Sequence, residues 1–107
     1  MAYTHKTLAL NQLPATQTDI CDPGAGETYL VHNITLHNIN TSTEIVELWK
    51  HNGTTAYQIL KVSLAINETL IISFGNDGLV LDGAHKLQGK TTTASKVTYD
   101  ISGSMVV

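Results

Sequence analysis

The chain has 107 residues, of which 42% are hydrophobic and 14% are charged, and its formal net charge is −3. This length fits one domain with one core, so residues 1–107 are expected to form a single domain. The six Lys and Arg residues are all lysines spread along the chain, which argues against a nucleic-acid partner because phosphate-binding surfaces need clustered cations.

The same composition argues against a membrane or secreted protein. No window approaches the roughly 18 apolar residues of a transmembrane helix, and the first residues lack the charged-then-apolar pattern of a secretory signal. We therefore expect a soluble protein that folds in a cytoplasm. Cys21 is the only cysteine, so an intrachain disulfide is ruled out, and the side chain is expected to be buried or half-buried.

Residues 1–20 carry short apolar positions interrupted by Pro14, which predicts two short extended pieces. Leu8, Leu10 and Leu13 would fray at the end of an isolated domain unless something covers them. We therefore expect these three residues at a protein interface. Two alternatives stay open: residues 1–20 form an extended arm that reaches a neighbouring chain, or they form the first strand of the domain itself.

A turn at residues 21–26 precedes a long predicted strand over residues 27–40. In that strand Leu30, Ile34 and Leu36 are expected on the apolar face. Polar residues typical of a turn follow, and residues 45–51 are then predicted to be a strand because they are rich in β-branched and aromatic residues. Asn52-Gly53 is the strongest hairpin signal in the chain.

The second half of the sequence continues in short extended runs at residues 57–64, 69–74, 79–81 and 85–88, with a last strand over residues 96–107. Gly103 is expected to permit a bulge in the last strand. A helix over residues 54–64 is the one competing interpretation, because Ala56, Leu60 and Leu64 are four residues apart. About eight short strands predict an all-β protein, an antiparallel β-sandwich or jelly-roll.

Histidines and carboxylates do not form a recognisable reactive motif. His32 and His37 are five residues apart on one predicted strand, so strict alternation would point them to opposite faces. A metal site would need His5, His51 or His85 to converge, or one histidine from each of several chains at a symmetry axis. No catalytic or nucleotide-binding motif occurs, so we expect no enzyme activity, no cofactor and no metal.

Aromatic residues leave one binding alternative open. Trp49, Tyr57 and Tyr99 could stack on sugar rings as a carbohydrate-binding platform, although aromatics at alternating strand positions are more often core or interface residues.

Several stretches together resemble the small β-sandwich virion proteins of tailed bacteriophages. Those proteins share a Pro-Ala-Gly turn, a "vsLaxgEtL" strand, an "LxaGDxI" turn and a closing "vxvxisG" strand. The matching stretches are Pro23-Gly24-Ala25-Gly26 and residues 31–40, 46–53, 62–70, 81–87 and 97–103. The resemblance covers roughly residues 20–103, and one departure is Ala84-His85, where the family has Gly-Asp.

The resemblance implies a structural virion protein, first of all a capsid decoration (cement) protein that contacts other virion proteins. A tail, collar or fibre-associated protein is the alternative, and a carbohydrate or host-surface binding module is another. It also implies a homo-oligomer, with a trimer as the state expected first. The residues expected at its interfaces are Leu8, Leu10, Leu13, Trp49, Tyr57, Met105 and Val106, the last two in a chain end that would add to neighbours.

Overall fold

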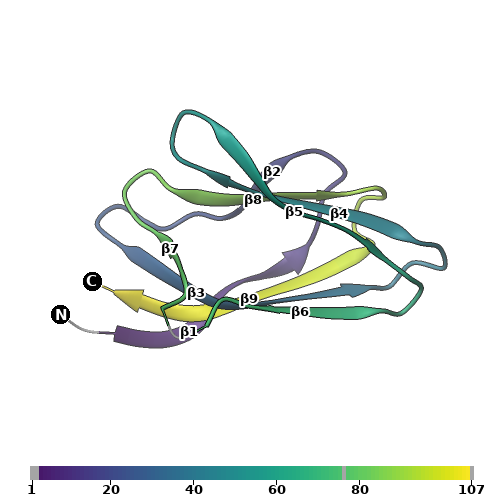
Figure 1. Cartoon of the computed structure of the whole chain (residues 1–107), viewed down its shortest axis with the longest axis horizontal. Coiled ribbons are helices and arrows are strands. Elements are labelled where there is room, and N and C mark those ends of the chain that lie inside the picture. The colour runs from purple at the N-terminus through teal and green to yellow at the C-terminus, as the bar shows by residue number, and fades with distance from the viewer. Residues whose placement is uncertain (1–2, 76, 107) are drawn as a thin grey trace.

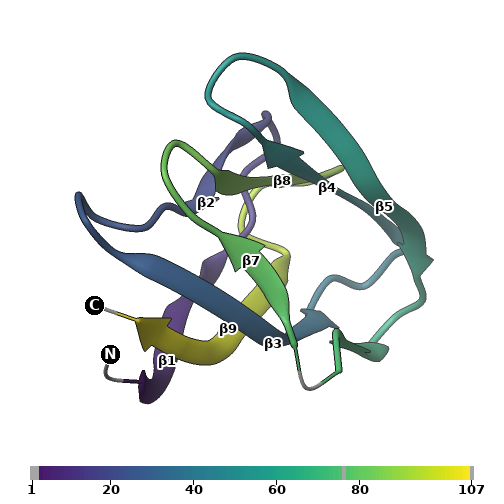
Figure 2. The same cartoon turned by 60° about the vertical axis from the view of Figure 1, so that its left-hand side comes forward.

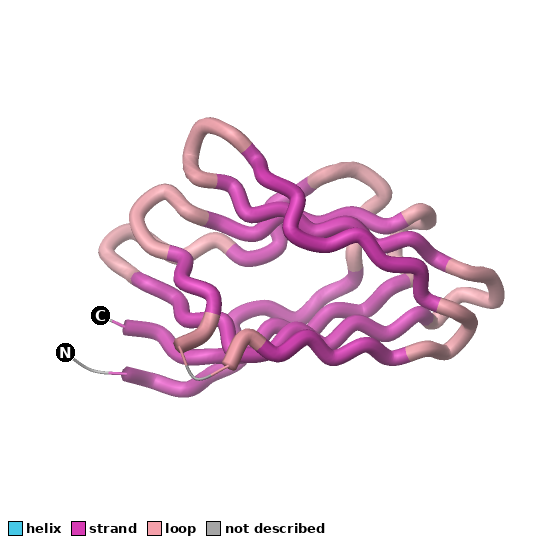
Figure 3. The backbone as a smooth tube through the Cα atoms, viewed as in Figure 1, coloured by secondary structure: helices cyan, strands magenta, loops and turns pink. Residues whose placement is uncertain are grey.

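The computed structural model describes residues 3–75 and 77–106, and every regular element within these ranges is a strand (Figure 3). The strands are β1 (Tyr3–Gln12), β2 (Thr18–Cys21), β3 (Thr28–Asn38), β4 (Glu44–His51), β5 (Ala56–Leu64), β6 (Thr69–Ser73), β7 (Leu79–Leu81), β8 (Lys86–Thr91) and β9 (Val97–Val106). The all-β prediction is therefore confirmed. The competing helix over residues 54–64 is wrong, because most of this segment is β5, a strand that pairs with β4.

The strands form two antiparallel sheets that lie as two layers (Figures 1 and 2). Sheet A has the order β1-β9-β3-β6 with β7 also paired to β3, and sheet B has the order β2-β8-β4-β5. Leaving out the short β7, the pairs β1–β9, β2–β8, β3–β6 and β4–β5 are nested, as in a long hairpin wrapped around a core. This strand order is that of a jelly roll.

The core lies between the sheets, where alternate side chains of both sheets meet. Predicted apolar positions such as Ile34 and Leu36 are fully buried there. The buried cluster consists of Leu13, Ile20, Cys21, Val31, Ile34, Leu36, Val46, Leu48, Leu64, Leu81, Leu87, Val97, Tyr99 and Ile101.

Two bulges interrupt the pairing of sheet A, one on each side of β9 and both next to Ser102. One shifts the register between Thr7 and Ala9 in β1, and the other shifts it between Val31 and Asn33 in β3. The extra residues therefore lie in the neighbours of β9, although the bulge was expected at Gly103 in β9 itself. Gly103 permits the close approach, because a Cβ there would overlap the carbonyl oxygen of Leu30.

The bulge in β3 corrects two expectations that assumed unbroken alternation. Val31 is fully buried where Leu30, only half-buried, was expected on the apolar face. His32 is the extra residue, and its side chain lies on the outer face of the sheet. His37, between the buried Leu36 and Asn38, also faces outward, so the prediction of opposite faces for the two histidines is wrong.

The loop between β3 and β4 is held by two buried polar side chains. Asn38 donates hydrogen bonds to the carbonyl oxygens of Ser42, Leu64 and Ala65 at 3.0–3.1 Å. The Glu44 carboxylate accepts hydrogen bonds at 2.8–3.0 Å from the backbone amide of Thr93 and from side chains of Asn40 and Thr91. Desolvation would raise the pKa of Glu44, but these hydrogen bonds outweigh it and hold the pKa below its usual value.

Candidate functional site

The outer face of sheet A carries a row of four side chains that face away from the core. Cross-strand pairing places Leu10 of β1, Asp100 of β9, Thr35 of β3 and Ile71 of β6 side by side. Leu10 and Ile71, at the two ends of the row, are 64% and 65% exposed, the highest values among the large apolar side chains described as exposed. We call these four residues the Leu10–Ile71 row.

The middle of this row contains an unpaired acceptor. Oδ1 of Asp100 is shielded from solvent and has no hydrogen-bond partner among the described residues. A shielded polar atom without a partner costs roughly 1–3 kcal/mol, so such atoms are uncommon unless something else supplies the hydrogen bond. Exposed apolar side chains on both sides of an unpaired acceptor are typical of a surface that contacts another protein.

On the outer face of sheet B, the carboxylates of Asp19 and Glu47 are paired with neighbouring side chains. Asp19 accepts hydrogen bonds from Gln88 at 2.8 Å and from Lys86 at 3.0 Å. The hydrogen bond from Gln88, followed by the attraction of Lys86, holds the pKa of Asp19 below its usual value. Glu47 accepts a hydrogen bond from Gln58 at 2.9 Å and lies 3.7 Å from the amine of Lys90. Both carboxylates of this face are thus paired within the chain.

The three aromatic residues of the proposed sugar platform do not share a surface. Trp49 is half-buried on the outer face of sheet B, in a cross-strand row with Gln58 and Gln88. Tyr57 is 59% exposed but pairs with Lys50, the residue after Trp49, which places it on the other side of the sheet. Tyr99 is 6% exposed in the core, so a platform of all three is wrong.

The predicted interface residues near the chain ends have different environments. Leu10 is exposed in the Leu10–Ile71 row, and Leu8 is half-buried against the core. Leu13 is fully buried, so the expectation that it contacts another protein is wrong. Its backbone also bonds to Val97 and Ser95, which fixes the path from β1 to β2.

Residues 3–12 form β1, which pairs along its length with β9 of the same chain (Figure 1). Of the two alternatives for the N-terminal segment, the structure therefore shows the strand. Met105 and Val106 are hydrogen-bonded between β1 and β3, in the interior of sheet A. The expectation that they add to a neighbouring chain is wrong, because an interior strand has no free edge; Val107 lies outside the described residues.

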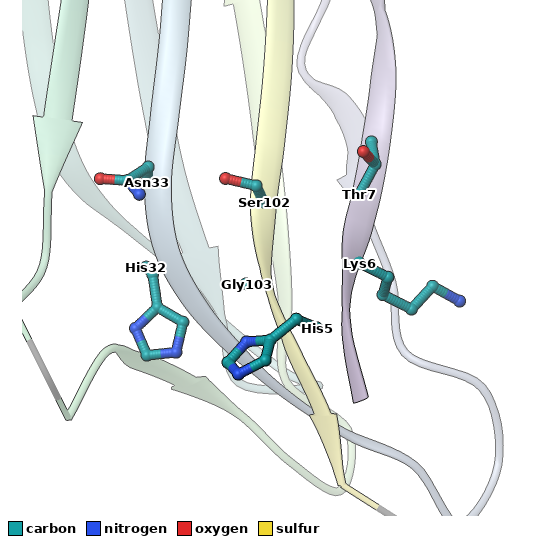
Figure 4. Close-up of a pocket in the computed structure, with 7 residues that line it drawn as sticks. All are labelled: His5, Lys6, Thr7, His32, Asn33, Ser102 and Gly103. Atoms are coloured by element: carbon teal, nitrogen blue, oxygen red, sulfur yellow. The ribbon is translucent and has the colours of Figure 1, made fainter. Parts of the chain in front are cut away.

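A recess opens on the outer face of sheet A, next to the two bulges. It has a volume of about 560 Å³ and is lined by His5, Lys6, Thr7, His32, Asn33, Ser102 and Gly103 (Figure 4). The imidazoles of His5 and His32 extend from β1 and β3 toward each other across β9 (Figure 4). Sequence reasoning missed this pairing, because only the strand order and the bulges bring the two histidines together.

Two further expectations concern reactive groups. Cys21 is buried as expected, and burial, with a smaller effect of Asp22, raises the pKa of its thiol to about 12. Such a thiol is a poor nucleophile at neutral pH. Among the residues that the structure describes, no three His, Cys, Asp or Glu side chains group closely enough to hold a metal ion.

Comparison with known proteins adds no relative: no family model matches the chain, and no curated protein is found to be similar to it. A search of the described residues for a helix long and apolar enough to cross a membrane finds none.

Proposed function

We propose that this chain is a structural virion protein of a tailed bacteriophage, a capsid decoration protein that binds other virion proteins through the outer face of sheet A. The sequence resemblance supports the virion role. The jelly roll supports it by analogy, since this fold recurs in viral capsid domains, although one fold serves many functions. A role in the tail, collar or fibre attachment would use the same surface.

The observation that carries the proposal is the asymmetry between the two outer faces. The two carboxylates on the outer face of sheet B, Asp19 and Glu47, are paired within the chain, whereas the Leu10–Ile71 row presents the two most exposed large apolar side chains around the unpaired oxygen of Asp100. A partner that covers the row with apolar atoms would bury the exposed side chains of Leu10 and Ile71. Short Thr and Ser side chains around the row lose little rotamer entropy on burial.

The test is a double substitution, Leu10→Ser with Ile71→Ser, which removes the apolar ends of the row. Both side chains are exposed, so the free energy of unfolding should change by less than about 1 kcal/mol. We expect the affinity of self-association and the affinity for phage particles each to fall by roughly tenfold or more. Size-exclusion chromatography with light scattering measures the first, and co-sedimentation with particles lacking the protein measures the second.

Ile66→Ser is the matched control, because Ile66 is 54% exposed but lies in the turn between β5 and β6, away from the row. It should leave both kinds of association unchanged. If the wild-type chain stays monomeric and does not bind particles, the proposal is wrong.

A carbohydrate-binding module is the second candidate, favoured by the outward-facing Trp49 between the side-chain amides of Gln58 and Gln88. These amides already bond to Glu47 and Asp19, so a sugar would have to displace hydrogen bonds that exist in the free chain. The chain has one tryptophan, so a change in its fluorescence on adding glycans, without particle binding, would favour this candidate.

A further inference from the structure

The recess between His5 and His32 has a hydrogen-bonded floor. Ser104 is 2% exposed, and its hydroxyl oxygen lies 2.9 Å from Nδ1 of His5 and 3.5 Å from Nε2 of His32. On the far side, Nδ1 of His32 lies 3.3 Å from the carbonyl oxygen of Gly75. The buried serine therefore couples two imidazoles that belong to β1 and β3.

This arrangement assigns the protons of the neutral cluster. A carbonyl oxygen only accepts, so Nδ1 of His32 donates to Gly75 and Nε2 of His32 is left as an acceptor. The hydroxyl of Ser104 then donates to Nε2 of His32 and accepts from Nδ1 of His5. Every member is satisfied by one directed chain, which leaves Nε2 of His5 as the unprotonated ring nitrogen of that residue.

Protonation of His5 gives this cluster one free donor. When His5 takes up a proton, its Nε2 becomes a donor that is not used by the chain of hydrogen bonds. A second proton, on Nε2 of His32, adds a positive charge but ends the hydrogen bond that this nitrogen accepts from Ser104, so both N–H groups of His32 then point toward Ser104 and Gly75. Ser102, Thr7 and Asn33 contribute neutral hydroxyl and amide groups to the lining.

The charges around the recess favour an anion. Although the chain carries a net charge of −3, no Asp or Glu is among the residues that line the recess. Lys6 lines it from β1 with its amine directed away from the histidines (Figure 4). The carboxylates closest in sequence to these elements are Asp77, in the loop between β6 and β7, and Asp100, two residues before Ser102 on β9.

We propose that this recess binds a small oxyanion, either phosphate or a carboxylate, and that binding strengthens as the two histidines become protonated. A charge-assisted hydrogen bond from the His5 imidazolium to an anionic oxygen, together with the positive charge of His32, supplies the affinity. The contacts with Ser104 and Gly75 position both rings beforehand, so little side-chain entropy is lost on binding. The site is separate from the Leu10–Ile71 row and does not depend on the proposed virion role.

The test titrates the full chain with inorganic phosphate and, in a parallel arm, with acetate. NMR amide shifts and calorimetry follow binding at about pH 5.5 and about pH 7.5, which bracket imidazole titration. We expect shifts centred on Ser102 and Gly103, with affinity roughly tenfold higher at the lower pH. Tighter phosphate binding would indicate a phosphate site, and tighter acetate binding would indicate a site for a carboxylate side chain.

His5→Asn with His32→Asn should reduce the affinity roughly tenfold or more. His37→Asn is the matched control, because His37 faces outward from the same strand as His32 but bonds to Thr69. Unchanged affinity in the double variant would overturn the proposal. Since that variant could lose stability, the wild-type shifts decide independently: no shifts at the recess with either anion, or shifts that do not depend on pH, would also overturn it.

Discussion

At the scale of single residues, Gly103 fixes the centre of sheet A. A Cβ at this position would overlap the carbonyl oxygen of Leu30, a backbone atom that β3 holds in place. We therefore expect Gly103→Ala to lower the free energy of unfolding by at least about 3 kcal/mol. Equilibrium unfolding in urea, followed by the fluorescence of Trp49, measures this loss.

Gly83→Ala is the control that separates steric overlap from backbone strain. Gly83 has a φ of +62°, yet a Cβ there would meet nothing within 4 Å. Its substitution should cost only about 1–2 kcal/mol, the cost of a left-handed conformation for an L-residue. Equal losses for the two variants would contradict the steric explanation for Gly103.

The different environments of Leu10 and Leu13 show how far residue patterns can predict which side chains are exposed. Both were expected at an interface because both are apolar and near a chain end, but one is exposed and the other is fully buried. Leu13 follows β1, where the chain crosses toward sheet B and carries the side chain into the core. The unpaired Asp100 was missed, because a carboxylate at an alternating strand position has no sequence signal for a missing partner.

At the scale of elements, the loop between β3 and β4 depends on an ionised and buried Glu44. Because the folded state lowers the pKa of Glu44, its contribution to stability is present above the usual value of 4.5 and is lost as pH falls through the lower folded-state pKa. Glu44→Gln should cost about 1–3 kcal/mol at neutral pH and should flatten the loss of stability below about pH 4.5.

Urea unfolding of the variant and the wild type across this pH range measures both effects. Glu68→Gln is the comparison, since the exposed Glu68 accepts one hydrogen bond, from the amide of Ala65, and holds only a turn. If Glu44→Gln and the wild type lose stability in parallel on acidification, the ionised carboxylate does not hold the loop.

Strands were predictable at this scale because alternation and turn residues are local signals. The β4–β5 hairpin at Asn52-Gly53 is one confirmed example, and the amide of Asn52 bonds there to the carbonyl of Thr55. The bulges were not predictable, since an extra residue in β1 or β3 is set by how closely β9 approaches at Gly103. Every error about the face of Leu30 and His32 follows from that one long-range contact.

At the scale of the whole molecule, nested pairing brings the two ends of the chain together at one side of sheet A. β1 and β9 are adjacent although they are the first and last strands, and both the Leu10–Ile71 row and the histidine recess cross them. Neither surface forms until β9 has paired with β1 and β3. A single sequence therefore indicates the fold class more readily than the site.

The same topology predicts what loss of the first strand would do. Without residues 1–12, β9 would become an edge strand with unpaired backbone groups, and Leu8 and Ala9 would no longer pack against the core. We expect this variant to unfold or aggregate, with a loss of more than about 3 kcal/mol in the free energy of unfolding if it folds at all.

Leu10→Ser is the control: it keeps β1 and removes one exposed side chain, so it should unfold as the wild type does. Thermal unfolding by circular dichroism, with light scattering for aggregation, distinguishes these cases. A truncated chain that remains a folded monomer with wild-type stability would show instead that residues 1–12 act as a dispensable arm.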